Sequence, residues 1–249
     1  MKILPLDKCI NKYDFKKFFV NSTTSTMDEA RNKLNSINNN FIVLAKKQTK
    51  GRGRHGNNWI SPSGNIYCSI ALSINKLKID LFKFGILSSV IIKKYLEYIG
   101  LSNIYFKWPN DIYCNGKKIS GILQESCYNN QAKQFIIIGI GINYKSSPNN
   151  LKYKTTCIND HVKNLNLNQC IEILINFFLK YLNDFYLKNN LFYFLEYKKF
   201  QIFLNIEIKI KINKNKTIYG KFIKINNDGS LMLKKDKEKL SIYSGQIQL

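Results

Sequence analysis

The stretch from which the rest of the chain can be understood is Gly51–Trp59, which reads GRGRHGNNW. Its three glycines permit main-chain conformations that a Cβ would block, so backbone N–H groups can approach a ligand closely. Of the three arginines in the whole chain, Arg52 and Arg54 both lie here. Because a guanidinium offers a planar fork of donors to carboxylate or phosphate, the loop predicts an anion-binding site. A flexible, solvated basic turn is the alternative interpretation of this stretch alone.

Length and composition favour one large domain, or a main domain with a small appendage. The chain has 249 residues, of which 45% are apolar, enough for a sizeable core. No uninterrupted apolar run approaches the roughly 20 residues of a membrane span, and Met1–Asp7 lacks the apolar core of a signal peptide. We therefore expect a cytoplasmic protein without a membrane partner. A plastid is the alternative if a leader has been removed or the source is a plastid-bearing parasite.

Cysteine usage and charge exclude several classes of function. The six cysteines lie scattered, with no Cys-x-x-Cys motif and no paired histidines. Neither a disulfide framework nor a protein-ligated metal is therefore expected. The formal net charge of +23 suggests a nucleic-acid partner. However, Lys, Asn and Ile are all unusually frequent along the whole chain, as a nucleotide bias in the coding sequence would produce. Non-specific attraction to polyanions is expected at low salt, but no specific DNA binding.

Two short apolar runs flank the loop and predict buried strands, at Phe41–Ala45 and Ile66–Leu72. The loop should therefore join two core strands, where a rigid scaffold displays functional groups. A Ser-Thr pair before the first strand opens a predicted helix that runs to about Asn39, with Thr26 and Glu29 as a capping box. The hydroxyl and N–H groups at this helix start are also suited to a polar ligand.

A predicted hairpin carries the second group of polar residues. Asn115-Gly116 between β-rich runs is typical of a two-residue type I′ turn. This turn would place Asn110-Asp111 on one strand, near the level of residues 120–123 on its partner, with Lys118 closer to the turn. Pro109 should lie at a strand end or a bulge, because proline cannot donate to a ladder. A simple solvent-exposed face is the alternative for these polar side chains.

The remaining chain shows a change of pattern near its end. Apolar periodicity predicts helices at residues 81–100, 167–188 and 191–203. A buried strand is predicted at residues 135–143, where two glycines leave room for a ligand or a close backbone. From about residue 204 the apolar residues alternate, which indicates a small all-β unit of about 45 residues. The expected domains are therefore residues 1–203 and 204–249.

Four motifs together resemble those of the biotin protein ligases, in that family's order. They are GRGRHG with Trp59, KWPND at 107–111, KISGIL at 118–123 and GIGIN at 139–143. The resemblance implies an α+β fold with a mixed sheet flanked by helices, as in class II aminoacyl-tRNA synthetases and lipoyl ligases. It also implies a small C-terminal SH3-like β domain. The chain has no room for the N-terminal winged helix of the family's regulatory members, so no repressor function is expected.

The resemblance implies a two-step, ATP-dependent ligase reaction. ATP and biotin would give biotinyl-5′-AMP and pyrophosphate, and biotin would then pass to a lysine of the biotin carrier domain of a biotin-dependent carboxylase, such as acetyl-CoA carboxylase. Mg²⁺ would be held through phosphates, which suits its preference for few protein ligands. A lipoate or octanoate ligase on the same scaffold and a basic nucleic-acid-binding protein are the alternatives. Homodimerisation stays open.

Carried over position by position, the resemblance assigns the site. Lys118, Arg54 and Asp111 would be catalytic: the cations would offset the repulsion between carboxylate and α-phosphate, and Asp111 would orient or deprotonate the incoming lysine. Closure of the loop would shield the intermediate from water. The biotin-binding residues would be Ser25, Thr26, Gln48, Gly51, Arg52, Arg54, Lys118, Gly121 and Gly141. The ATP-binding residues would be Arg54, Trp59, Lys107, Asn110, Lys118 and Asn143.

Overall fold

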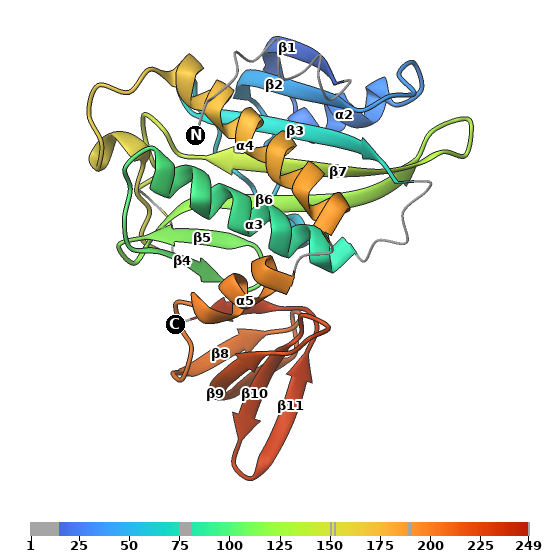
Figure 1. Ribbon diagram of the computed structural model, residues 1–249. Helices are drawn as coiled ribbons and strands as arrows, with labels where there is room; N and C mark the ends of the chain where they lie inside the picture. Colours follow the sequence, from blue (N-terminus) through green and yellow to red (C-terminus); the bar gives the residue numbers. More distant parts are fainter. Residues whose placement is uncertain (1–14, 75–80, 150, 152, 189–190, 249) are drawn as a thin grey trace.

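The computed structural model describes residues 15–74, 81–149, 151, 153–188 and 191–248. Its larger sheet has seven strands in the order β1-β2-β3-β7-β6-β5-β4 (Figure 1). Among the pairings of these described strands, only β1–β2 is parallel, so the sheet is mixed, as expected. The strands are β1 Lys16–Thr23, β2 Phe41–Gln48, β3 Ile66–Ser73, β4 Ile104–Lys107, β5 Asp111–Cys114, β6 Lys117–Tyr128 and β7 Gln134–Ile142.

Helices cover both faces of this sheet, which explains the uninterrupted apolar runs at residues 41–45 of β2 and 135–138 of β7. Along β2, Ile42 and Leu44 point to the large core beneath α3 (Leu81–Tyr98) and α4 (Leu167–Lys188). The alternate residues Phe41 and Val43 join a second core beneath α2 (Thr26–Lys33). This division follows from the period of two along a strand.

The smaller sheet is formed by the C-terminal β segment. Its five antiparallel strands run in the order β11-β10-β9-β8-β12 (Figure 1). α5 (Leu191–Lys199) precedes it and lies between the two sheets in the ribbon view. The strands are β8 Glu207–Lys211, β9 Thr217–Ile225, β10 Leu231–Lys235, β11 Glu238–Ile242 and β12 Gln246–Gln248.

Backbone hydrogen bonds tie the edge of the larger sheet to the segment between α5 and β8, and one buried indole reaches the turn between β9 and β10 of the smaller sheet. At the β4 edge, the Phe106 N–H donates to the Phe200 carbonyl and the Ile202 N–H donates to the Phe106 carbonyl, both at 2.8 Å. Trp108 is 1% exposed, and its Nε1–H donates to the Gly229 carbonyl at 3.1 Å. The KWPND motif therefore contributes a joint between the sheets as well as polar groups.

Several elements differ from the sequence predictions. β1 was not predicted, although seven of its eight residues pair with β2. α2 ends at Lys33 rather than near residue 39, and its N-cap is Ser25 rather than Thr26, since the Ser25 hydroxyl accepts the Met27 N–H at 3.2 Å. β12 was also missed, because its three residues are too short for a pattern.

Within the described residues, no helix combines the length and the apolar character that crossing a membrane requires.

Candidate active site

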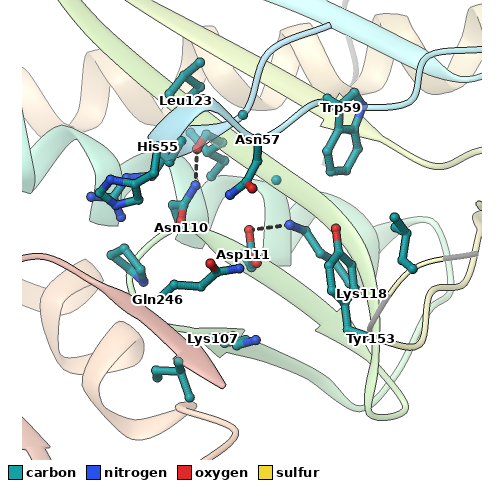
Figure 2. A pocket seen from close by; sticks show the side chains of 18 of the residues that line it. His55, Asn57, Trp59, Lys107, Asn110, Asp111, Lys118, Leu123, Tyr153 and Gln246 are labelled. Carbon is teal, nitrogen blue, oxygen red and sulfur yellow. Dashed lines mark hydrogen bonds and ion pairs between the residues drawn. The ribbon is translucent and has the colours of Figure 1, made fainter. Parts of the chain in front are cut away.

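A cavity of about 1180 Å³ lies between the larger sheet, the 51–59 loop and the edge of the smaller sheet (Figure 2). It is lined by every site residue expected from the sequence except Gly51 and Asn143. Those two residues support the lining from behind. A Cβ on Gly51 would lie 2.3 Å from the Trp59 carbonyl oxygen, and the buried Asn143 amide donates to the Thr156 carbonyl at 3.0 Å. The residues assigned to biotin and to ATP thus surround one space.

A β-bulge brings the two central charges together. Asp111 pairs with Gly121 and Ile112 with Ser120, but Tyr113 then pairs with Lys118, so Ile119 has no opposite partner. In a regular ladder Lys118 would point to the opposite face from Asp111, because a shift of one residue changes the face of a side chain. The extra residue instead directs Lys118 Nζ to Asp111 Oδ1, at 2.7 Å (Figure 2).

Two aromatic rings flank the Lys118 ammonium. Its Nζ lies 5.3 Å from the ring centroids of both Trp59 and Tyr153, within cation–π range. Trp59 follows the Gly-rich loop, whereas Tyr153 belongs to the segment after β7 (Figure 2). Sequence reasoning missed Tyr153, because an aromatic residue in a polar loop carries no motif. The lysine is thus buried and held by one carboxylate and two ring faces.

The Trp59 indole occupies the space left by the missing side chains of Gly121 and Gly141. A Cβ on Gly141 would lie 2.5 Å from the indole, and one on Gly121 would lie 3.1 Å from it. These glycines are directly opposite each other in the β6–β7 ladder. The sequence predicted that this space would accommodate biotin; in this structure it accommodates Trp59. The indole N–H has no hydrogen-bond partner among the described residues.

The α2 N-terminus joins the base of the loop through a chain of hydrogen bonds. The backbone N–H and the hydroxyl of Thr26 donate to Gln48 Oε1, at 2.8 and 3.2 Å. Gln48 Nε2 donates to the Ser61 hydroxyl at 2.8 Å, and this hydroxyl donates to the Trp59 carbonyl at 2.8 Å. Ser69 also donates to the Thr26 hydroxyl. These groups are preorganised at one end of the cavity.

The two loop arginines have different surroundings. Arg52 pairs with Asp28, at 2.8 Å, and with Glu125, at 3.0 Å. Arg54 lies in the 3-10 turn Arg54–Gly56, and burial lowers the pKa of its guanidinium, opposed by the nearby Asp111 carboxylate. His55 has φ 55°, and burial together with Arg54 lowers its pKa. Both arginines line the cavity, but among the described ion pairs only Arg52 is paired with carboxylates.

Lys107 is the last residue of β4, and Asn110 is the last residue of the 108–110 turn that follows it. Pro109 belongs to this turn between β4 and β5, so Asn110 precedes β5 rather than lying on it as predicted. Its amide donates to the Ile122 carbonyl at 2.5 Å. Burial lowers the pKa of Lys107, and the neighbouring Lys118 lowers it further against the opposing effect of Asp111.

The smaller sheet contributes a wall that the sequence did not indicate. Lys209 and Lys211 of β8 line the cavity together with Gln246 and Gln248 of β12. These residues were missed because the alternation of β8 shows which side chains face solvent, but not which other element stands opposite them. Asp111 is the only carboxylate among the described lining residues. The cavity is therefore strongly positive and suited to a polyanion.

Residues 18–143 match a family model described as the Biotin/lipoate A/B protein ligase family. The chain belongs to this family. It is 29% identical over 236 residues to the bifunctional ligase/repressor BirA of Bacillus subtilis, covering 92% of this chain and 72% of that protein. It is 30% identical over 131 residues to the biotin–[acetyl-CoA-carboxylase] ligase of Paracoccus denitrificans, covering 51% and 53% of the two chains.

A solved structure extends the family likeness to nearly the whole fold. The biotin protein ligase from Aquifex aeolicus, solved in complex with biotin and ATP, aligns with a TM-score of 0.78 and 25% identity. The alignment covers 94% of this chain and 97% of that one. The α+β fold inferred from the four motifs is therefore confirmed, including the presence of a C-terminal sheet.

Proposed function

We propose that this chain is a biotin protein ligase. In the first step, a carboxylate oxygen of biotin attacks the α-phosphorus of ATP, the bond to the β-phosphate breaks and pyrophosphate leaves. In the second step, the amine of a carrier lysine attacks the biotinyl carbonyl carbon, the nitrogen loses a proton and AMP leaves. The family match and the relatives with this activity support the reaction. The site chemistry below supports the roles of the residues.

The Lys118–Asp111 pair is the observation on which these roles depend. The first step brings two anions together, so a cation must offset their repulsion where they meet. Lys118 is buried, held by Asp111 and two rings, and lies near the middle of the cavity. A cation fixed before substrate binding needs little reorganisation during the reaction. Arg54 supplies a second charge from the loop, and Asp111 would orient or deprotonate the carrier lysine in the second step.

The two ends of the cavity differ in a way that fits the two substrates. The preorganised hydroxyl and amide groups at Ser25, Thr26 and Gln48 suit the polar ring head of biotin. At the other end, Lys107 and Asn110 would bind the nucleotide. Trp59, which lies beside Lys118 in this structure, would form a wall against its adenine. Lys209 and Lys211 stand nearby to attract its phosphates. Biotin and ATP would thus meet at Lys118.

The residues present do not form a ligand set for Mg²⁺. Hard cations require several oxygen ligands, and the one carboxylate among the described lining residues is already paired with Lys118. Among the described residues, no three His, Cys, Asp or Glu side chains gather as a metal site. We therefore treat Mg²⁺ as part of the substrate, bound through the ATP phosphates.

The partner in the second step would be the biotin carrier domain of a biotin-dependent carboxylase. We also place residues 1–203 in a catalytic domain and 204–249 in a C-terminal domain that completes the nucleotide end of the cavity. The basic field of the chain would speed encounter with an acidic carrier. Specific DNA binding forms no part of the proposal.

The test is incubation with biotin and α-labelled ATP, followed by addition of a biotin carrier domain. The expected result is labelled biotinyl-AMP that disappears as AMP is released and biotin appears on one lysine of the carrier. Adenylation of lipoate or octanoate instead of biotin would agree with the family but would refute biotin as the substrate. Activation of none of these acids would overturn the proposed function.

A further inference from the structure

Arg52 connects the Gly-rich loop to two other elements. Asp28 of α2 contacts its Nη2 at 2.8 Å, and Glu125 of β6 contacts Nη1 at 3.0 Å and Nη2 at 3.2 Å. The contact with Glu125 engages both terminal nitrogens, the geometry in which an arginine–carboxylate pair is strongest. Arg31 of α2 also pairs with Glu125. Two arginines and two carboxylates thus balance in charge, so Arg52 is not available as a free cation for a substrate.

The loop itself forms a small closed unit. The Trp59 N–H donates to the Gly51 carbonyl at 2.9 Å, and the Gly53 N–H donates to the Asn57 carbonyl at 2.7 Å. In its Arg54–Gly56 turn, Arg54 is half-buried and both His55 and Gly56 are exposed. A unit with its own backbone bonds and an unburied tip can move as a lid, and the side chains at its base then decide how long it stays closed.

The carboxylates that bind Arg52 lie at the rim of the cavity. Asp28 follows Thr26 by two residues at the start of α2. Glu125 follows Leu123 by two residues along β6, on the face that carries Leu123 and Gly121 into the cavity. The ion pairs therefore join the loop to the two elements that flank the end assigned to biotin.

We propose that Asp28 and Glu125 are positioning residues that hold the 51–59 loop closed through Arg52 and thereby set how long the activated acyl-adenylate is retained. The inference rests on the proposed function. It assigns no contact with substrate to either carboxylate. Because partly exposed ion pairs contribute little to folding, their loss should change retention far more than thermal stability.

The test compares the doubly substituted D28N/E125Q protein with the unmodified chain in two assays. The first measures release of preformed biotinyl-AMP after dilution, and the second measures trypsin cleavage after Arg52 and Arg54 in the absence of ligands. We expect release to accelerate about tenfold, the size of effect that loss of about 1.4 kcal/mol gives. We also expect faster cleavage in the loop, with a single-turnover adenylation rate within about twofold of normal.

Two control variants separate loop closure from general charge effects. Glu29 lies beside Asp28 on α2 and pairs with Lys33 at 3.1 Å, so E29Q removes a carboxylate of the same helix without touching the loop. R31Q removes the other partner of Glu125 and leaves its contact with Arg52. Both variants should release adenylate at the normal rate.

Unchanged release in D28N/E125Q would overturn the proposal. A fall in melting temperature with unchanged release and unchanged cleavage would show a purely structural role and would overturn it as well. If the unmodified chain makes no biotinyl-AMP, the proposed function fails. The ligand-free trypsin comparison would then still show whether these carboxylates hold the loop.

Discussion

The β5–β6 hairpin and the 51–59 loop both bring cations to the cavity, but they hold them by different means. The hairpin lies inside the seven-stranded sheet, and a bulge fixes Lys118 against Asp111. The loop projects from the sheet, and partly exposed ion pairs of Arg52 connect it to its neighbours. The difference suggests a division of work. Under the proposed function, the cation needed for bond formation would be built into the sheet, and the cation that covers the intermediate would be carried on a segment that can move.

Replacing Lys118 should have the largest effect, because it removes the built-in cation. We expect K118A to lower the single-turnover rate of adenylate formation by about 10²- to 10³-fold, as loss of one preorganised charge-stabilising group does. The rate is measured with labelled ATP and saturating biotin. Lys117 provides a matched control: it is exposed on the same strand and does not line the cavity, so K117A should adenylate normally. Near-normal adenylation by K118A would refute the assignment of bond formation to Lys118.

Replacing Arg54 should affect retention more than formation. We expect R54A to release biotinyl-AMP about 10- to 100-fold faster, since its charge then no longer helps to close the loop over an anion. Circular dichroism should show an intact fold. The exposed Lys50, just before the loop, gives the control variant K50A. Tight retention by R54A would show that closure does not depend on this cation.

The contact between the hairpin and the loop can be tested at Gly141. A methyl group there would overlap the Trp59 indole, from which it would lie 2.5 Å. We expect G141A to displace the ring and raise the KM for ATP about tenfold, and to raise the KM for biotin as well, because Gly141 borders the space assigned to biotin. Trp59 fluorescence should change on substitution. The double variant W59F/G141A should recover part of the affinity for ATP, because a phenylalanine ring is smaller than the indole. An unchanged KM for ATP would show that Trp59 does not contribute to nucleotide binding.

The smallest expected effect is a shift in pH dependence. Burial and Lys118 lower the pKa of Lys107, so this side chain loses its charge at a lower pH than an exposed lysine does. The KM for ATP should therefore rise as the pH increases through that lowered pKa. In K107R this rise should be absent, because a guanidinium stays protonated across the range. Identical alkaline profiles of the two proteins would exclude Lys107 as the titrating group.

Much of the architecture could be predicted from the sequence, because its signals are local. The Asn115-Gly116 turn is present with φ values of 49° and 74°, and the apolar runs beside the loop are β2 and β3. The Asp111–Gly121 level in the hairpin was also predicted correctly. Turn chemistry and strand periodicity act over a few residues, so one sequence is enough to find them.

The arrangement of the site depended on effects that are not local. The bulge at Ile119 decides which face Lys118 occupies, yet no residue type there signals it. Tyr153 and Lys209 reach the cavity only because separate segments pack together. The two loop arginines also differ in their partners, because Arg52 pairs with Asp28 and Glu125, which are distant from it in the sequence. Tertiary packing, rather than propensity, sets these contacts.

The connection between the two sheets affects how substrates enter the cavity and how products leave it. Trp108 and the backbone bonds of Phe106 fasten the β9–β10 turn and the segment before β8 to the edge of the larger sheet. With that side fastened, the 51–59 loop is the part best placed to open a route to solvent. Substrates, pyrophosphate and the carrier lysine would then share one gate, and the order in which they use it would depend on when the loop lifts.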